Sequence, residues 1–329
     1  MSKVLVTTVP FAASSRLPIE MLEASEIEYV INPLRRKLKE DELAEMIGDF
    51  DVVIAGTESI TQKVIDRAKR LKLISRVGVG LDSVDLNAAR RRDILVSYTP
   101  DAPAPAVAEL TLGAILTLLR HLHSSNSGMH RGEWNRFFGR RISEVKFGII
   151  GAGRIGGRVI QMLSSLGAPK IMVNDVNPGS EIYQHSNIDW VDKEIIYKEA
   201  DLISLHLPLT EVTKNMIGIE QIKQMKRDAF LVNTSRGGII NEADLAFALN
   251  SGLVSGAAID VFEKEPYNGD LQNIEKCLLT SHMGSMSMDC RTQMEVEATE
   301  EAVRFLTGQH LRSLVPEEEY AMQIAGGHQ

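Results

Sequence analysis

The sequence predicts an α/β protein with two doubly wound parallel-sheet domains. Short runs of β-branched residues alternate with amphipathic helical segments, a pattern typical of βαβ units. The alternation occurs twice, before and after a proline-rich break at residues 99–105. In addition, the length of 329 residues exceeds what one domain of ordinary size requires. We therefore expect each half of the chain to form its own sheet.

Five apolar runs predict the strands of the first sheet. They are Lys3–Thr8, Tyr29–Asn32, Asp51–Gly56, Leu73–Gly78 and Ile94–Thr99. The segments Glu40–Ile47 and Thr61–Arg70 between them have the spacing of amphipathic helices. Pro100, Pro103 and Pro105 follow, and because proline continues neither a strand nor a helix, they predict a domain boundary. We expect a flavodoxin-like domain before this boundary.

Six further runs predict the strands of the second sheet. They are Lys146–Gly151, Lys170–Asp175, Asp201–Pro208, Ala229–Ser235, Ser255–Phe262 and Cys277–His282. Six such strands are what a Rossmann dinucleotide-binding domain needs. The apolar segment Ala106–Leu119 predicts a buried helix, and Met286–Leu306 predicts a helix that returns the chain to the first domain. The tail Gln323–Gln329 is expected to be disordered.

The composition argues against several classes of partner. Hydrophobic residues make up 44% and charged residues 24%, as in ordinary globular proteins. A net charge of −8 disfavours general binding to nucleic acid or to a membrane surface. The segment Ala106–Leu119 contains Glu109 and is too short to span a bilayer. We therefore expect no nucleic-acid partner and no membrane partner.

The two cysteines and the N-terminal residues bear on location. Cys277 and Cys290 lack the spacing of metal ligands and give no disulfide framework, which suits a reducing cytosol. The first ten residues lack the apolar core of a signal peptide. We therefore expect a cytoplasmic protein without a metal site.

A glycine pattern after the first strand of the second series predicts a nucleotide site. Gly151, Gly153 and Gly156 form G-x-G-x-x-G between a predicted strand and a predicted helix. Gly151 permits the tight turn, Gly153 admits a pyrophosphate, and Gly156 allows the helix to pack closely. The alternative is a plain glycine turn.

The next strand of this unit ends in a carboxylate. Asp175 follows Gly156 by 19 residues and is placed to accept hydrogen bonds from ribose hydroxyls. Because residues 176–178 include no arginine, the pattern favours NAD(H) over NADP(H). The alternative is a surface aspartate.

Several polar residues follow predicted strands, where doubly wound sheets build their sites. Arg236 suits bidentate binding of a carboxylate, and His282 suits acid–base chemistry near neutral pH. The loop at Val77–Gly80 offers backbone N–H groups to an anion, and Arg76 precedes it. The alternatives are that Arg236 is a surface residue and that His282 has a structural role.

The chain resembles the D-2-hydroxyacid dehydrogenase family, in the group that includes phosphoglycerate dehydrogenases. The resemblance covers nearly the whole chain, with the glycine pattern in the middle. The similar blocks are residues 75–86, 106–116, 206–217, 231–245, 257–266 and 279–287. The resemblance implies NAD-dependent, reversible hydride transfer between a 2-oxo and a 2-hydroxy acid.

The resemblance also implies roles for individual residues. It implies a catalytic trio of Arg236, Glu265 and His282, in which Glu265 orients His282. The implied cofactor contacts, in which Asp260 holds the nicotinamide carboxamide, are Val107, Gly151, Gly153, Arg154, Ile155, Gly156, Asp175, His206, Pro208, Thr213, Thr234 and Asp260. The implied substrate contacts are Arg76, Val79, Gly80, Arg236 and Ser285.

Domain bounds and assembly follow from the same resemblance. The substrate-binding domain is expected at residues 1–100 and 290–329, and the NAD-binding domain at residues 101–289. An arm at about residues 105–144 is expected to pack on a second copy and form a homodimer. Trp134, Phe137 and Phe138 supply its apolar surface. The alternative is that these aromatic residues fold back onto their own domain.

The sequence departs from the family in the first domain. Several phosphoglycerate dehydrogenases carry an arginine in the loop after the third strand, whereas Gly56–Ser59 contains none. Arg76, or Arg35 with Arg36, would replace it, although Arg35 and Arg36 also suit a solvated helix start. The short stretch after residue 306 predicts no appended regulatory domain. We expect 3-phosphoglycerate as substrate, with glyoxylate, hydroxypyruvate and a phosphono-oxo acid as rivals.

Two further functions are compatible with this architecture. Formate dehydrogenases resemble the pattern with an amide in place of the glutamate, so Glu265 argues against them. An NAD-sensing binding protein, like the C-terminal-binding-protein corepressors, can retain the same trio. Turnover of NADH with a 2-oxo acid distinguishes an enzyme from such a sensor.

Overall fold

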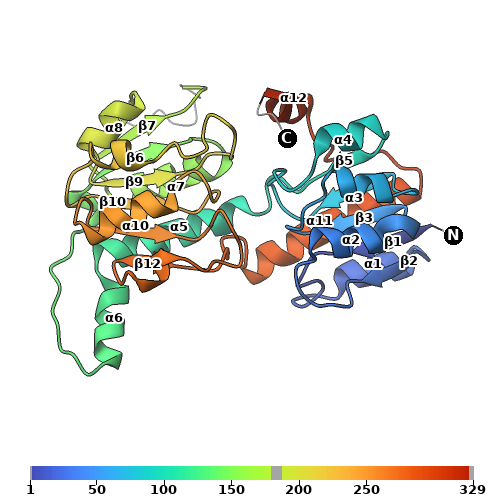
Figure 1. Ribbon diagram of the computed structural model, residues 1–329, viewed down its shortest axis with the longest axis horizontal. Coiled ribbons are helices and arrows are strands. Elements are labelled where there is room, and N and C mark those ends of the chain that lie inside the picture. Colours follow the sequence, from blue (N-terminus) through green and yellow to red (C-terminus); the bar gives the residue numbers. More distant parts are fainter. Residues whose placement is uncertain (1, 179–186, 326–329) are drawn as a thin grey trace. The chain divides into compact units, whose positions relative to one another are not determined.

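The computed structural model describes residues 2–178 and 187–325. The chain divides into two compact units, one formed by Met1–Pro103 with Met286–Gln329 and the other by Ala104–Ser285. Each unit is built around one parallel β-sheet with helices on both faces (Figure 1). This confirms the predicted fold class of two doubly wound domains.

The first sheet has five parallel strands in the order β2-β1-β3-β4-β5. The strands are β1 (Lys3–Val6), β2 (Glu28–Ile31), β3 (Val52–Ala55), β4 (Leu73–Arg76) and β5 (Leu95–Ser97). All five predicted strands are confirmed, although each ends one or two residues before the end of its apolar run. The order is that of a flavodoxin-like sheet, and it reverses direction between β1 and β3.

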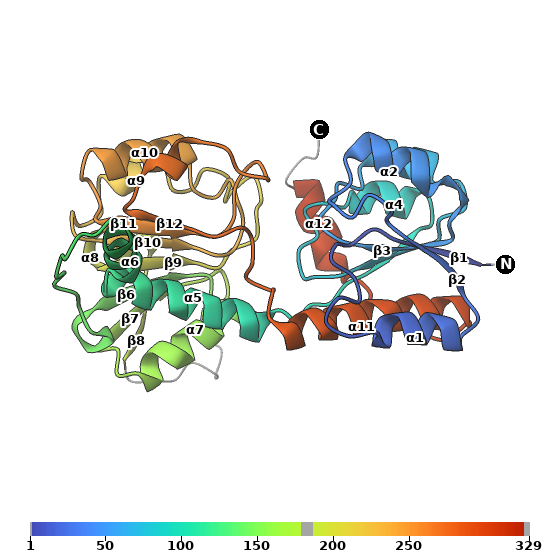
Figure 2. The same cartoon turned by 90° about the horizontal axis from the view of Figure 1, so that it is seen from below.

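Helices cover both faces of this sheet (Figure 2). They are α1 (Leu17–Ala24), α2 (Glu40–Met46), α3 (Gln62–Arg67), α4 (Leu86–Arg91), α11 (Met288–Leu306) and α12 (Glu317–Ala325), with a 3-10 turn at Ile47–Asp49. Helix α11 is the predicted returning helix. It packs against β3, β4 and α1, and the Ser75 hydroxyl donates to the Ala298 carbonyl at 2.7 Å.

The end of the described chain forms helix α12, so the predicted disorder of the tail is wrong from Gln323 to Ala325. The Gln323 amide donates to the carbonyl oxygens of Leu81 at 3.2 Å and Val84 at 2.8 Å. Its oxygen accepts the Leu86 N–H at 3.0 Å. A glutamine has no sequence signature for such tertiary contacts. The rest of the predicted tail, residues 326–329, lies outside the described residues.

The second sheet has seven parallel strands in the order β12-β11-β10-β9-β6-β7-β8. The strands are β6 (Lys146–Ile150), β7 (Lys170–Asn174), β8 (Ile188–Trp190), β9 (Leu202–Leu205), β10 (Phe230–Asn233), β11 (Gly256–Ile259) and β12 (Cys277–Leu279). The six predicted strands are confirmed, but the count of six is wrong. Strand β8 is short and only half-buried at the sheet edge, so it has no apolar run. The order reverses between β6 and β9, as in a Rossmann sheet.

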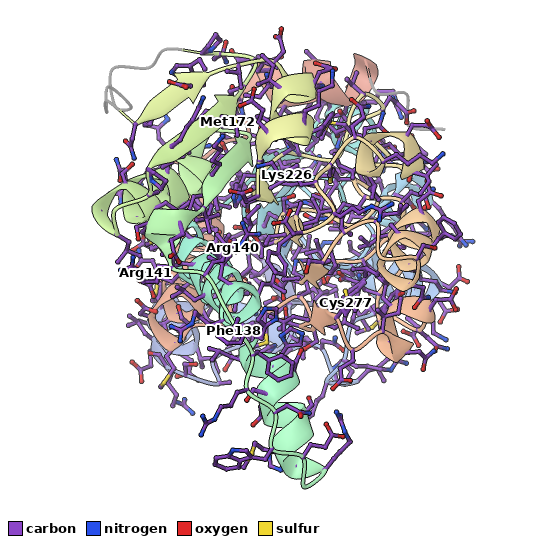
Figure 3. The ribbon with its side chains drawn as sticks, turned by 90° about the vertical axis from the view of Figure 1, so that its left-hand side faces the viewer. Phe138, Arg140, Arg141, Met172, Lys226 and Cys277 are labelled. Atoms are coloured by element: carbon purple, nitrogen blue, oxygen red, sulfur yellow. The ribbon has the colours of Figure 1, made fainter. Side chains whose placement is uncertain are left out.

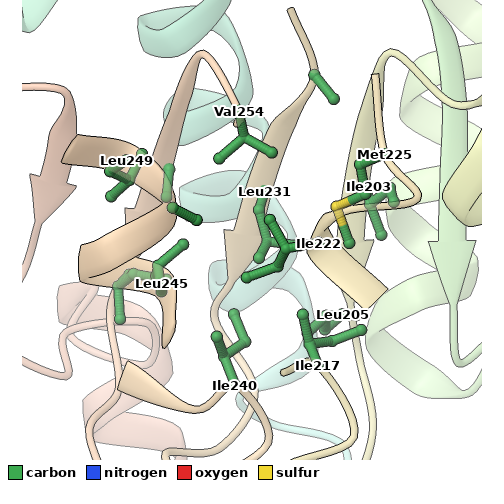
Figure 4. Close-up of a cluster of buried hydrophobic side chains, with 14 of the residues drawn as sticks. Ile203, Leu205, Ile217, Ile222, Met225, Leu231, Ile240, Leu245, Leu249 and Val254 are labelled. Carbon is green, nitrogen blue, oxygen red and sulfur yellow. The ribbon is translucent and has the colours of Figure 1, made fainter. Parts of the chain in front are cut away.

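Two apolar layers sandwich this sheet. Helices α5 (Ala104–Leu119) and α7 (Arg154–Ser165) pack on one face. Helices α8 (Lys193–Glu199), α9 (Ile219–Ile222) and α10 (Glu242–Asn250) pack on the other face, where Leu231, Ile222 and Leu245 belong to one buried cluster (Figure 4). Short 3-10 turns lie at Ile142–Glu144 and Asp270–Asn273.

Helix α5 follows the boundary between the units. Pro105 lies in its first turn, so the expectation that this proline cannot continue a helix is wrong. The first turn tolerates proline because its N–H groups have no partner inside the helix. Among the described helices, none is by itself long and apolar enough to cross a membrane. Helices α5 and α6 (Leu122–His130) pass together by length and composition, with a 66° bend between them.

The segment between α5 and β6 projects from the second unit (Figure 1). Helix α6 leads outward, and residues 131–141 return without regular structure past Phe138, Arg140 and Arg141 (Figure 3). Trp134 is 75% exposed and Phe138 is fully exposed, whereas Phe137 stacks on His121 at 5.6 Å. Arg140 fixes the returning end through Asp228 at 3.2 Å. The segment therefore presents apolar surface outward on a firmly anchored base.

Candidate active site

The polar residues singled out in the second unit follow neighbouring strands of one sheet. Because parallel strands end at the same edge, the turns after β7, β6, β9, β10, β11 and β12 stand side by side in that order. The residues that these turns carry are Asp175, Gly151, His206, Arg236, Glu265 and His282. One edge of the sheet therefore gathers both the predicted nucleotide loop and the predicted catalytic trio.

The glycine loop is shaped by close backbone contacts. Gly151 has a φ of +95°, and a Cβ there would lie 2.2 Å from the His206 carbonyl oxygen. A Cβ on Gly156 would lie 2.0 Å from the Gly151 carbonyl oxygen. By contrast, Gly153 has open space around its Cβ position and stands at the N-cap of α7, with Arg154 and Ile155 in the first turn. This cradle fits a pyrophosphate, because the first N–H groups of α7 have no partner within the helix.

Asp175 stands at the end of β7 beside this loop. Its carboxylate accepts the N–H of Ala152 at 2.6 Å and the N–H of Asn177 at 2.9 Å. These bonds use one lone pair on each oxygen, and an ionised carboxylate has about four acceptor positions. Asp175 therefore retains the capacity to accept hydroxyl donors, as a ribose-binding residue requires.

His206 begins the turn after β9, where the strand order reverses. Its Nε2 lies 2.9 Å from the Ser204 hydroxyl, and the structure gives its buried Nδ1 no partner among the described residues. Desolvation by burial lowers the pKa of His206 to about 4. The ring is therefore neutral at pH 7 and unsuited to act as a cation toward a phosphate.

The remaining predicted cofactor contacts lie in the turn after β9, directly after β10 and on helix α5. The Thr213 hydroxyl donates to the Pro208 carbonyl at 2.7 Å and so closes the turn after His206. The Thr234 and Thr111 hydroxyls lie 2.7 Å apart in a buried pair between β10 and α5. Val107 lies one helical turn earlier on α5, and its carbonyl accepts from Thr111 at 2.8 Å. Thr111 is not evident from the sequence, because a threonine within an apolar helix has no pattern that indicates its partner.

Arg236 follows β10 at a crowded turn. Its guanidinium Nη1 donates to the Ser235 carbonyl at 2.7 Å, and its own carbonyl accepts from the Asn233 amide at 2.8 Å. A Cβ on the next residue, Gly237, would lie 2.0 Å from the carbonyl oxygen of Phe262. The turn that carries Arg236 is therefore in backbone contact with the turn that carries Glu265.

Glu265 and His282 form a direct pair. His282 Nδ1 lies 3.0 and 2.9 Å from the two carboxylate oxygens of Glu265. Glu265 also accepts the Phe262 N–H at 3.1 Å, which fixes the carboxylate from its own turn. The His282 side chain is 39% exposed and the Glu265 side chain 24%, so the ring contacts Glu265 and also reaches solvent. A carboxylate beside Nδ1 favours the tautomer that carries its proton on Nδ1. Nε2 lies on the other side of the ring, away from these two bonds.

Asp260 ties the His282 segment to β11. Its carboxylate accepts the Thr280 hydroxyl at 2.5 Å and the N–H groups of Met283 at 2.9 Å and Gly284 at 3.0 Å. Its carbonyl accepts the His282 N–H at 2.8 Å. The residue is buried, and these donors explain how a charge is tolerated there. The contact with nicotinamide stays a prediction, since three acceptor positions already serve the protein.

Glu242, at the start of α10, is a further carboxylate near the trio that the sequence did not indicate. It accepts the Glu263 N–H at 2.7 Å and so holds the turn that carries Glu265. Its pKa is raised by burial and by the negative charges of Glu263 and Glu265. Its only sequence signal is an acidic first turn after a capping asparagine, which is common to many helices.

The predicted substrate contacts are divided between the units. Ser285 is half-buried in the second unit, three residues after His282. Val79 and Gly80 are half-buried in the loop after β4 of the first unit. Arg76 is only 5% exposed, and its guanidinium donates to the Val77 carbonyl at 2.7 Å. Its contact with an anion stays a prediction.

The other arginines proposed to replace the missing loop arginine follow β2. Arg36 forms a bidentate pair with Glu42 at 2.6 and 2.8 Å, and the pair is exposed. Arg35 is exposed and has a φ of +51°. The contacts of Arg36 agree with the alternative of a solvated helix start.

Comparison with known proteins matches the residues just described. Residues 112–284 match the family model described as D-isomer specific 2-hydroxyacid dehydrogenase, NAD binding domain. The chain is 34% identical to a hydroxypyruvate reductase of Thermotoga maritima over 276 residues, which cover 82% of this chain and 89% of that protein. It is 36% identical to a D-3-phosphoglycerate dehydrogenase of Methanocaldococcus jannaschii over 299 residues, which cover 89% of this chain and 56% of that protein.

A solved structure shares the fold over nearly the whole chain. The TT0316 protein from Thermus thermophilus superposes with a TM-score of 0.85 at 30% identity and covers 95% of this chain and 100% of that one. The present chain spans only about half the length of the Methanocaldococcus protein, 56%. Nevertheless, the family model covers more than half of this chain, including the glycine loop and the Glu265–His282 pair. The chain therefore belongs to the D-isomer specific 2-hydroxyacid dehydrogenase family and carries its NAD-binding domain.

Proposed function

We propose that this chain is an NAD-dependent dehydrogenase that interconverts a small anionic 2-oxo acid and the corresponding D-2-hydroxy acid. The observation that carries the proposal is the pairing of His282 with both carboxylate oxygens of Glu265, in a turn that contacts the turn of Arg236. An acid–base group, its orienting carboxylate and a carboxylate-binding cation are the groups that this reaction requires from a protein.

Each member of the trio has one role in the proposal. Bound NADH supplies the hydride. Arg236 binds the substrate carboxylate and polarises the carbonyl group, as its fork of donors permits. His282 donates a proton from Nε2 to the carbonyl oxygen, while Glu265 holds Nδ1 and supports the positive charge of the ring. In the oxidative direction, His282 accepts the proton again.

The second unit has the features that NAD binding needs. The open N-cap at Gly153 suits the pyrophosphate, and Asp175 suits the ribose hydroxyls. We propose Arg154, Ile155, His206, Pro208, Thr213, Thr234, Val107 and Asp260 as the remaining contacts. The neutral ring of His206 favours packing against the cofactor over charge pairing.

The relatives of this chain differ in the substrate that their names give. The relatives' names include both phosphoglycerate dehydrogenase and hydroxypyruvate reductase. The expectation of 3-phosphoglycerate rests partly on Arg76, whose guanidinium donates to backbone carbonyl groups. We propose Arg236 and Ser285, together with Arg76, Val79 and Gly80 of the first unit, as substrate contacts.

Assembly and location complete the proposal. We propose a homodimer built on the segment of about residues 105–144, supported by the exposure of Trp134 and Phe138. We propose a cytoplasmic location, supported by two buried cysteines, Cys277 and Cys290, that form no disulfide.

A screen of NADH oxidation over several 2-oxo acids tests the proposed function. We expect turnover with at least one of them, and about a 10²–10⁴-fold lower kcat in His282→Ala with little change in NADH affinity. Arg236→Ala should lose turnover mainly through a higher KM for the 2-oxo acid. Near-normal kcat in His282→Ala would remove it from the acid–base role. NADH binding without any turnover would instead favour the NAD-sensing alternative.

A further inference from the structure

We propose that Glu242 is a positioning residue for the acid–base pair: it occupies the Glu263 N–H, so that the Glu265 carboxylate keeps His282 as its partner. This inference rests on the proposed function and concerns a residue outside the predicted trio. All of the residues involved belong to the second unit. The observation that carries the inference is that two carboxylates share two successive backbone donors.

The two donors are the N–H groups of Phe262 and Glu263, in the turn after β11. The Phe262 N–H donates to Oε1 of Glu265 at 3.1 Å, and the Glu263 N–H donates to Oε1 of Glu242 at 2.7 Å. Successive N–H groups in a turn form a concavity that can bind one anionic group. Here the carboxylate of the turn itself takes one donor, and a side chain from helix α10 takes the other.

This arrangement matters because Glu265 has a choice of donors. Its Oε1, which accepts the Phe262 N–H, also lies 3.0 Å from Nδ1 of His282, and its Oε2 lies 2.9 Å from the same nitrogen. An unoccupied Glu263 N–H would be a second backbone donor beside the first. A carboxylate that turned to accept both N–H groups would exchange its contact with the ring for them. Because Glu242 takes this donor, Glu265 is better satisfied beside His282.

The backbone that carries Glu242 is itself fixed. Glu242 is the first residue of α10 and is half-buried. The preceding residue, Asn241, caps the helix, and its side chain accepts the Asp244 N–H at 3.0 Å. The Asn241 N–H donates to the Ile217 carbonyl at 2.9 Å. Glu242 therefore reaches the turn after β11 from a firmly held helix start.

The loop that ends at Glu242 begins at Arg236 and touches the same turn there as well. A Cβ on Gly237 would lie 2.0 Å from the Phe262 carbonyl oxygen and 2.5 Å from the Glu263 nitrogen. The turn is thus contacted at both ends of this loop, by packing at Gly237 and by a hydrogen bond at Glu242. The close packing at Gly237 also favours a protein acceptor over a water molecule at the Glu263 N–H.

Substitutions at residue 242 test this inference through NADH-dependent reduction of a 2-oxo acid. Glu242→Leu nearly keeps the volume but removes the acceptor, and it should lower kcat by about fivefold with unchanged NADH affinity. Glu242→Gln keeps an acceptor oxygen and should retain most of kcat. Glu194→Leu removes an exposed carboxylate from the first turn of α8 in the same unit, and it should leave kcat unchanged.

A double-mutant cycle separates this role from a structural one. In a Glu265→Gln protein the pair with His282 is already altered, so the addition of Glu242→Leu should lower kcat by less than about twofold more. A side chain that affects the site by another route would lower kcat by the same factor in both backgrounds.

Glu242→Asp covers the case in which Glu242→Leu does not fold. It keeps a carboxylate at the helix start but withdraws it by one methylene group, so kcat should fall several-fold while Tm changes little. A normal kcat in folded Glu242→Leu or Glu242→Asp, equal losses in Glu242→Gln and Glu242→Leu, or independent effects in the cycle overturns this inference alone. No turnover of any 2-oxo acid by the unmodified protein refutes the proposed function and this inference with it.

Discussion

The Nδ1 atom of His282 lies 3.0 and 2.9 Å from the two carboxylate oxygens of Glu265. Both residues stand in turns after neighbouring parallel strands, β12 and β11, and the Phe262 N–H fixes the carboxylate from its own turn. Because Glu265 holds Nδ1, Nε2 is the ring atom that the proposed mechanism assigns to the substrate. The proposed chemistry requires that Nδ1 binds Glu265 while Nε2 exchanges a proton with the substrate.

Replacing Glu265 by Gln should lower the rate of reduction. An amide no longer accepts from Nδ1 through two carboxylate oxygens, so the imidazole ring is less firmly oriented and kcat should fall by about tenfold or more. Glu263→Gln changes an exposed side chain two residues away and should leave kcat nearly unchanged. A normal kcat in Glu265→Gln would count against a role for the pair in proton transfer.

Asp175 should make NADH the better hydride donor. The double substitution Asp175→Ser with Asn177→Arg removes a carboxylate that repels a 2′-phosphate and adds a cation that attracts it. We expect the ratio of kcat/KM for NADH over NADPH to fall by at least about tenfold. The single change Asn177→Arg is the control, and it should shift the ratio less. Equal use of both cofactors by the unmodified protein contradicts the role given to Asp175.

Two alanine substitutions in the glycine loop should separate binding from folding. Gly153 has open space at its Cβ position, so Gly153→Ala should leave Tm nearly unchanged while it weakens NADH binding by about tenfold or more. Gly156→Ala places a methyl group against the Gly151 carbonyl and should lower Tm by several degrees. Thermal melts and NADH titration distinguish the two. Unchanged NADH affinity in Gly153→Ala would exclude the open N-cap as the pyrophosphate site.

The exposed aromatic residues of the segment after α6 should hold two copies together. Light scattering of the purified protein at micromolar concentration should give the mass of a dimer. Trp134→Glu with Phe138→Glu places charges on side chains that are exposed here and should release monomers. Val176→Glu alters another exposed apolar side chain of the same unit and should leave the dimer intact. A monomeric mass for the unmodified protein refutes the dimer.

The stability of the folded protein should fall in acid partly because His206 becomes protonated. Burial lowers the pKa of His206 to about 4, below its unfolded value of about 6.5. The neutral ring therefore contributes stability above about pH 6.5, and this contribution is lost as the pH falls through about 4. His206→Asn should reduce the fall in Tm between pH 7 and pH 4.5 by a few degrees. His310→Asn, at an exposed position, should not, and equal falls in all three proteins would contradict the assignment.

The sequence predicts site residues best where a polar residue directly follows a buried strand. Gly151, Arg236 and His282 each follow an apolar run, and an apolar run identifies both a buried strand and the edge at which it ends. Strand β8 has no such run, because it lies at the sheet edge with its side chains half-exposed, and the sequence does not reveal it. Local pattern therefore predicts the strands that carry an apolar run, edge strands such as β2 and β12 included, and misses a strand that carries none.

Contacts between distant residues are not predictable in the same way. Glu58 and Thr7 are 51 residues apart, and Gln323 reaches Leu86 across 237. No sequence pattern predicts the partner of a glutamate in a turn or of a glutamine in a helix at the end of the described residues. The absence of an arginine in Gly56–Ser59 is visible in the sequence, but the burial of the Glu58 side chain in that loop becomes evident only from the fold.

The first unit is interrupted by the second, and this constrains the order of events during synthesis. Helix α11, which covers β3 and β4, is translated only after all of Ala104–Ser285. Until then, one face of the first sheet is without its longest helix, whereas the second unit is continuous and complete. Because domains generally fold as units, the half of the protein that is translated second is expected to become compact first. The N-terminal strands therefore emerge earliest and reach their final packing last.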